Sequence, residues 1–218
     1  MPKNKHSSKT SLPRAKTTLK PTRIQREKTE AILEAALEVF SNRGFRGATL
    51  DLIAEEAKLS KPNLLYYFAS KEALHAELLS GLMKVWLEPL AQIKPEGDPI
   101  EEICAYIERK LELSKKFPRE SRLFANEIIQ EAPRSKSAQN DQLKELVDDK
   151  AALIQSWIDA GSLAPVDPLH LLFSIWATTQ HYSDFDAQIK TIMGADYETR
   201  YTGAKAYLVD MFTKTLTP

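Results

Sequence analysis

The chain has 218 residues, in which 30 Lys and Arg balance 30 Asp and Glu, so the formal net charge is zero. The bases are unevenly spread, because residues 1–26 hold eight of them and no acid, which leaves 22 bases against 30 acids in the rest. Cys104 is the single cysteine, which excludes an internal disulfide framework, and no stretch approaches the roughly 18 apolar residues of a membrane-spanning helix. We therefore expect a soluble, cytoplasmic protein. The basic end indicates a polyanionic or membrane-surface partner for that end alone.

The first third of the chain is predicted to contain an arm and three helices. Residues 1–22 are mostly Lys, Ser, Thr and Pro with almost nothing to bury, so a disordered basic arm is expected there. Apolar residues then recur at helical spacing over residues 23–44, and Gly44 suits a left-handed position at a helix end. Two short helices follow over residues 50–58 and 63–68, with Thr49 and Ser60 as their N-caps.

The same periodicity predicts six further helices and no strand. They are expected over residues 71–89, 100–116, 120–131, 141–160, 168–184 and 197–215. Pro89 is expected to bend or end the first of them, and residues 133–140 are expected to form a polar loop. The chain is therefore predicted to be all-α, with about nine helices.

The two short helices over residues 49–68 have the spacing of a helix-turn-helix. Spacing alone is weak evidence, but the residue types strengthen it. The second helix and its flanks carry hydrogen-bonding or cationic groups suited to base edges and phosphates, namely Ser60, Lys61, Asn63, Tyr66 and Tyr67. Lys71, at the start of the next helix, is placed to meet a phosphate. This pattern favours double-stranded DNA as the partner of the basic end.

Three motifs in register resemble the TetR family of transcriptional regulators. They are a Gly-Phe-x-Gly turn at 44–47, an Ile-Ala-x-x-Ala helix at 53–57 and a Tyr-Tyr-Phe-x-Ser-Lys-Glu junction at 66–72. The resemblance implies a helix-turn-helix domain over residues 23–70 and a helical ligand-binding and dimerisation domain over 71–218. It also implies phosphate contacts by Thr49 and Lys71, and base reading by Ser60, Lys61, Asn63 and Tyr66.

The second half is similar to TetR-family regulators of pyrimidine utilisation, in the segments 86–90, 121–124, 161–168 and 173–185. That similarity implies a homodimer that binds a palindromic operator as a repressor and releases it when uracil or thymine binds. The regulated genes would serve pyrimidine and nitrogen catabolism. The implied pyrimidine pocket contains Trp86, Trp176 and Gln180.

The side chains expected in this pocket have the chemistry needed to bind a pyrimidine. Trp176 and Gln180 are four residues apart, so a flat indole and an amide share one helix face. One amide can pair with both an N–H and a C=O group of a pyrimidinedione, while the ring stacks on tryptophan. Phe124 and Tyr182 are expected to complete the cage. Asn126 stands where an apolar residue is expected, which could alter ligand preference.

Other interpretations stay open at this stage. The basic arm either binds the DNA backbone or only solubilises the chain, and Trp86 and Trp176 are either ligand contacts or plain core residues. The nearer rival is a TetR-like regulator of another small apolar or aromatic ligand; the farther one is an all-helical enzyme or scaffold. No catalytic constellation, cofactor motif or metal-ligand spacing supports an enzyme. The dimer interface is expected on the helices over 167–184 and 197–215.

Overall fold

The computed structural model describes residues 22–130 and 137–218, with no side-chain description for 137–139. Within these ranges the chain forms ten α-helices, one 3-10 helix and no strand, which confirms the all-α prediction. The arm predicted over residues 1–22 lies outside the described residues except for Thr22. No helix in the described ranges is long and apolar enough to cross a bilayer.

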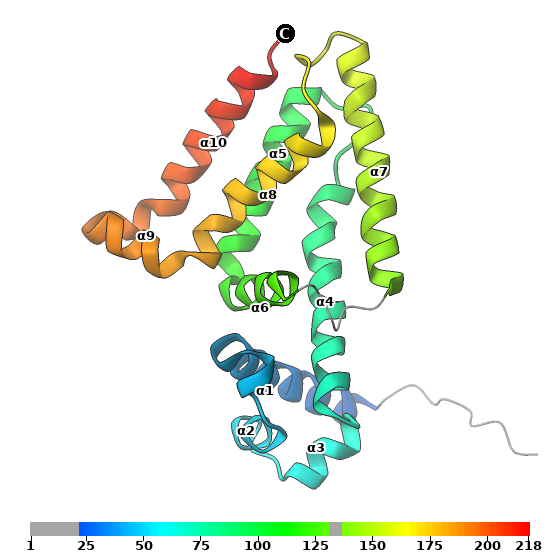
Figure 1. Ribbon diagram of the computed structural model, residues 1–218, viewed down its shortest axis with the longest axis vertical. Helices are drawn as coiled ribbons and strands as arrows, with labels where there is room; N and C mark the ends of the chain where they lie inside the picture. Colours follow the sequence, from blue (N-terminus) through cyan, green and yellow to red (C-terminus); the bar gives the residue numbers. More distant parts are fainter. Residues whose placement is uncertain (1–21, 131–136) are drawn as a thin grey trace, which may run out of the picture.

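Three helices and the first half of a fourth form one end of the molecule (Figure 1). Their bounds are α1 Arg23–Gly47, α2 Leu50–Glu56, α3 Lys61–Tyr67 and α4 Lys71–Ala91. A buried cluster from all four helices holds this end together, with Ile32, Phe40, Ile53, Leu64 and Leu74 fully buried at its centre. Burial of large apolar side chains is the main force that fixes such short helices.

The two predicted N-caps, Thr49 and Ser60, are present, and Ser70 caps α4 in the same way. Thr49 Oγ1 accepts from the Leu52 N–H, Ser60 Oγ from the Asn63 N–H, and Ser70 Oγ from the Ala73 N–H. Gly44 has φ +65°, a left-handed value that glycine adopts without strain, and the chain kinks there before one last turn of α1. These local signals fix where α2, α3 and α4 begin.

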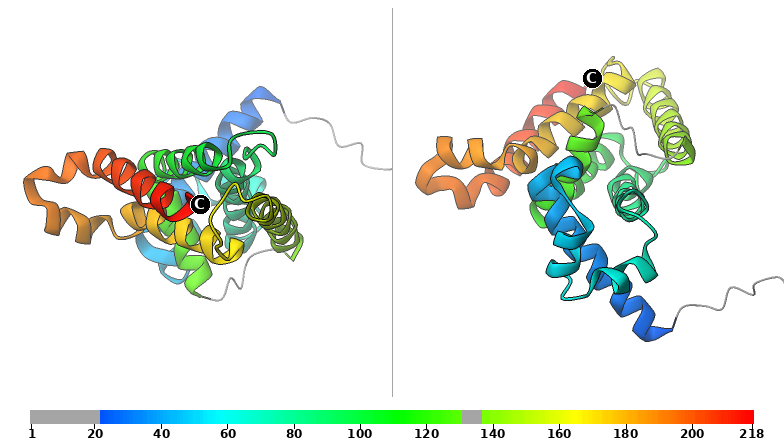
Figure 2. Two further views of the ribbon diagram at one scale, coloured as in Figure 1. Left: turned by 90° about the horizontal axis from the view of Figure 1, so that it is seen from above. Right: turned by 60° about the horizontal axis from the view of Figure 1, so that its bottom comes forward.

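The other end of the molecule contains the remaining helices around a second buried cluster (Figure 1). Their bounds are α5 Pro99–Lys116, α6 Pro118–Ile129, α7 Ser137–Asp159, α8 Pro168–Asp184, α9 Asp186–Met193, the 3-10 helix Gly194–Thr199 and α10 Arg200–Leu216. The α5 helix lies at the centre, since α8 and α10 both pack along it. The α9 segment projects away from this body in both views of Figure 2.

The structure corrects two boundaries and adds one helix. The α4 helix does not end at Pro89 but continues to Ala91, because a proline this close to the C-terminus costs a single hydrogen bond and its ring is buried. The α7 helix begins at Ser137, so residues 137–140 are helical rather than part of a loop, while residues 133–136 lie outside the described ranges. The α9 helix was not predicted, because its eight residues bury only Ile189 and leave little periodicity to detect.

Candidate functional site

The first candidate site is the outer surface of α3, at the end of the molecule farthest from the C-terminus (Figure 1). Leu64 and Phe68 are buried and anchor α3 against the neighbouring helices. Lys61 and Asn63 are exposed on the same helix, and Tyr66 is 74% exposed. The predicted base-reading residues are therefore all exposed at this end of the molecule, on α3 and at its N-cap.

Thr49 and Ser60 both use their side-chain oxygens as helix caps. Each hydroxyl accepts a backbone N–H, but a hydroxyl also has one hydrogen to donate and a second lone pair. Both residues are exposed. They can therefore donate to a phosphate while the caps stay intact, and the cap fixes where that hydroxyl lies.

Lys61 and Asp51 form an exposed ion pair between α3 and α2, with Nζ and Oδ2 2.9 Å apart. Pairs exposed to this degree contribute at most about 1 kcal/mol. The ammonium of Lys61 can therefore exchange this carboxylate for a phosphate or a base edge at little cost.

Lys71 has a structural role that the sequence did not predict. Its Nζ donates to the backbone oxygens of Phe45 and Ala48, each at 2.9 Å, and lies 4.3 Å from the centre of the Phe45 ring. Two of the three N–H groups of the ammonium are used in this way. Lys71 thus ties α4 to the turn that precedes Thr49 and keeps one donor for a phosphate.

Tyr67 differs from its neighbour Tyr66. Its ring is half-buried at the edge of the first core cluster and meets Tyr66 edge-on, with ring centroids 5.2 Å apart. The structure therefore gives Tyr67 a supporting position behind Tyr66, with less surface available to DNA than the sequence interpretation assumed.

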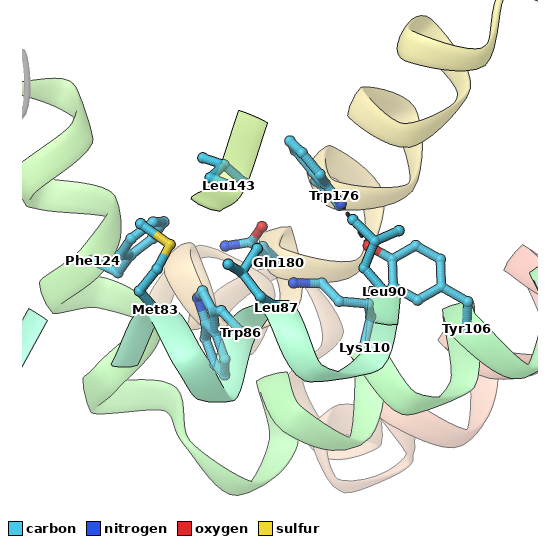
Figure 3. A pocket seen from close by; sticks show the side chains of 10 residues that line it. All are labelled: Met83, Trp86, Leu87, Leu90, Tyr106, Lys110, Phe124, Leu143, Trp176 and Gln180. Atoms are coloured by element: carbon cyan, nitrogen blue, oxygen red, sulfur yellow. Dashed lines mark hydrogen bonds between the residues drawn. The ribbon is translucent and has the colours of Figure 1, made fainter. Parts of the chain in front are cut away.

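The second candidate site is an apolar pocket among α4, α5, α6, α7 and α8, with about 70 Å³ of space for the centres of water-sized molecules. Figure 3 shows Trp86 from α4, Phe124 from α6, and Trp176 and Gln180 from α8 around this space. Four of the five predicted ligand residues therefore meet in one pocket. Trp86 is also only 6% exposed, so it serves the core and the pocket together.

Tyr182, the fifth predicted ligand residue, is not among the residues that line this pocket. Its ring packs near Tyr201, with centroids 6.1 Å apart. Residues two positions apart on a helix point in nearly opposite directions, so Tyr182 and Gln180 do not share a face. The expectation that Tyr182 closes the cage is therefore corrected for this pocket.

Two pocket residues from α5 were missed. Tyr106 is buried, and its hydroxyl accepts a 2.6 Å hydrogen bond from Nε1 of Trp176, which fixes the indole. Lys110 is only 3% exposed, and its Nζ lies 5.1 Å from the centre of the Trp86 ring. Burial lowers the pKa of Lys110 to about 8. The signal was available, because Lys110 falls within the helical stripe that contains Ile107 and Leu111.

A buried polar network lies behind the pocket. The hydroxyl of Ser121 donates to Oδ1 of Asp184, and the hydroxyl of Ser183 lies 2.9 Å from both Ser121 Oγ and the backbone oxygen of Gln180. Burial raises the pKa of Asp184, while the serine hydroxyls and the charge of Lys110 oppose that shift. The network therefore joins α6 to the part of α8 that carries Gln180.

The α6 helix also contacts the helix-turn-helix end. The guanidinium of Arg119 binds Glu38 at 2.8 Å and Glu34 at 2.7 Å, both on α1. Its hydrogen bond to Glu38, together with one from Asn42, lowers the pKa of Glu38. Leu123 is part of the first core cluster, and the adjacent Phe124 lines the pocket. Both α6 and α4 therefore connect the pocket directly to the first three helices.

The fold is that of a helix-turn-helix transcriptional regulator, and comparison with known families agrees. Residues 32–78 match bacterial regulatory proteins of the tetR family, and residues 79–218 match the C-terminal region of YcdC-like proteins. The chain belongs to the TetR family, whose members are helix-turn-helix regulators of transcription and not enzymes.

Among curated proteins, the HTH-type transcriptional regulator RutR of Escherichia coli strain K12 is 48% identical over 180 residues, which cover 83% of this chain and 85% of that protein. The repressor NicS of Pseudomonas putida is 28% identical over 134 residues, covering 60% and 61% of the two chains.

Solved structures share the fold. A putative transcriptional regulator, SCO4942 from Streptomyces coelicolor, superposes with a TM-score of 0.69 at 24% identity, covering 88% of this chain and 99% of that one. AibR in complex with isovaleryl coenzyme A and operator DNA superposes with a TM-score of 0.60 at 22% identity, covering 72% and 85%.

Proposed function

We propose that this protein is a cytoplasmic repressor that binds a palindromic operator as a homodimer and releases it when uracil or thymine enters the pocket. The genes that it regulates would be those of pyrimidine and nitrogen catabolism. The 48% identity to RutR, a regulator of the same family, supports this proposal. The observation that carries it is the meeting of Trp86, Trp176 and Gln180 in one pocket.

The pocket matches the chemistry of a pyrimidinedione. Gln180 offers one acceptor and two donors, which can pair with a ring N–H and its neighbouring carbonyl. The indoles of Trp86 and Trp176 offer flat faces to a planar ring. In such an apolar enclosure, a ligand that leaves the amide unpaired is strongly rejected.

The proposed dimer interface is formed by α8 and α10. Both helices pack on α5 and expose large apolar side chains on their other surfaces, namely Leu169 at 41%, Phe173 at 48% and Tyr207 at 64%. Large apolar side chains exposed on two neighbouring helices favour a protein partner, and a second copy of the chain gives a two-fold interface. Two α3 helices would then meet half-sites one DNA turn apart, about 34 Å.

Release of DNA follows from a shift between two populations. The α4 helix carries Trp86 in the pocket and Leu74 in the first core cluster, so a ligand that moves one end of α4 moves the other. The α6 helix offers a parallel connection through Phe124 and Arg119. A ligand that binds the released state roughly 100-fold more tightly supplies about 2.7 kcal/mol, enough to empty an operator.

Replacing Gln180 by alanine tests this proposal. The variant is expected to bind operator DNA and to keep it when uracil is added, because the ring loses its paired hydrogen bonds. The measurement is an electrophoretic shift titrated with uracil and thymine, with the wild type beside it. Dissociation of the variant's complex at the wild-type uracil concentration would reject the pocket as the sensor.

A further inference from the structure

The polar groups of the pocket are mostly donors. Gln180 contributes one acceptor oxygen, whereas donors come from its amide nitrogen, from Lys110 and from the hydroxyl of Tyr106. That hydroxyl already accepts from Trp176 and has its own hydrogen left to donate. The pocket is therefore complementary to a ligand that presents several carbonyl oxygens, as a pyrimidinedione does with two.

Nε1 of Trp86 is a buried pocket donor with no acceptor among the described residues, and Lys110 is the charged donor that lies beside the same ring. The side chain of Lys110 is 3% exposed, and among the described residues its ammonium has no hydrogen-bond acceptor. The ring of Trp86, 5.1 Å away, compensates only part of the lost hydration. Asp184 attracts the charge from a distance, but its Oδ1 already accepts from Ser121. A buried cation without a hydrogen-bond acceptor is destabilising unless a ligand supplies one.

The geometry of the side chains supports a ligand contact. Figure 3 shows the ammonium of Lys110 and the amide of Gln180 both directed toward the middle of the pocket, from α5 and α8 respectively. A pyrimidinedione has two carbonyl groups that flank one ring N–H. If Gln180 pairs with the N–H and one carbonyl, the second carbonyl is free for another donor. Lys110 is the charged donor in the pocket lining.

We propose that Lys110 is a specificity-determining residue, whose ammonium donates to a carbonyl oxygen of the ligand and selects planar cyclic imides with electron-rich oxygens. This inference rests on the proposed function and adds that the ammonium of Lys110 recognises a carbonyl oxygen of the ligand. A ligand carbonyl would replace part of the hydration that burial takes from this ammonium.

The variant Lys110→Met tests the inference, because methionine fills the same volume without the charge. Uracil affinity is expected to fall by about tenfold to 100-fold, the usual loss for a hydrogen bond to a charged group. The melting temperature of the free variant is expected to rise, since a desolvated cation has been removed. If Lys110 had only a structural role, the substitution would lower the melting temperature as well as the uracil affinity. The matched control is Lys115→Met on the exposed surface of α5, which should change neither.

Barbiturate provides the second arm of the experiment. At neutral pH it keeps both ring N–H groups but carries negative charge on its carbonyl oxygens, so Lys110→Met should weaken barbiturate by a larger factor than uracil. Calorimetric titration of both ligands into both proteins measures the two ratios. Three results would overturn the role of Lys110 and leave the proposed function standing. They are an unchanged uracil affinity in the variant, equal losses of affinity for the two ligands, and a wild type that does not bind barbiturate. A wild type that binds neither uracil nor thymine would overturn both.

Discussion

Replacing Lys71 by alanine is expected to weaken operator binding by roughly tenfold to 100-fold, because two contributions are lost together. The remaining N–H of the ammonium can no longer reach a phosphate. The bonds to the oxygens of Phe45 and Ala48 also disappear, so the turn that positions Thr49 becomes less fixed. The loss should be similar for operator and random DNA, since phosphates carry no sequence information.

The salt dependence separates the two contributions. Losing one phosphate contact should lower the slope of log affinity against log salt by about 0.9, whereas a looser turn alone should leave the slope unchanged. Fluorescence anisotropy with operator DNA over a series of salt concentrations measures both. The matched control is Lys84→Ala, an exposed lysine farther along α4, which should keep wild-type affinity and slope. Unchanged affinity in Lys71→Ala would remove Lys71 from the DNA interface.

Placing a carboxylate on the proposed dimer interface, by Tyr207→Glu, is expected to convert the dimer to monomers. Tyr207 is 64% exposed on α10, so the substitution leaves the fold of one chain intact while charge enters an apolar contact in both copies at once. Two linked helix-turn-helix domains bind a palindrome more tightly than one by a factor of roughly 100 or more, so operator affinity should fall by at least that factor.

Sedimentation or light scattering measures the molar mass, and a shift assay measures the loss of operator binding. The control variant is Ile128→Glu, at a position on α6 that is 49% exposed and lies outside the proposed interface. It should remain a dimer. A Tyr207→Glu protein with the mass and operator affinity of the wild type would show that the two copies meet elsewhere.

The helix-turn-helix could be predicted from the sequence because its signals are local. Thr49, Ser60 and Ser70 each cap the helix that immediately follows, and the resulting bonds span only three residues. The meeting of Trp176 and Gln180 is likewise a consequence of helix period. These features require no knowledge of how distant segments pack.

The missed features depend on distant segments. The carbonyl groups bound by Lys71 come from residues 23 and 26 positions earlier, and Tyr106 meets Trp176 across 70 positions. Neither contact has a periodic signature. Lys110 was detectable as a charge within an apolar stripe, yet its position at the pocket appears only when α5 packs against α4 and α8. Tyr182 was misplaced because aromatic character was given more weight than its direction on the helix.

In the proposed mechanism, the pocket of each chain binds a pyrimidinedione and this binding releases DNA. The most direct test of this mechanism is calorimetric titration of uracil and thymine into the wild-type protein, first free and then bound to operator DNA. This mechanism predicts one site per chain in the free protein and weaker apparent binding in the DNA complex, because uracil and DNA oppose each other's binding. Equal affinity for uracil in the free and DNA-bound protein, or no binding in either, would contradict it.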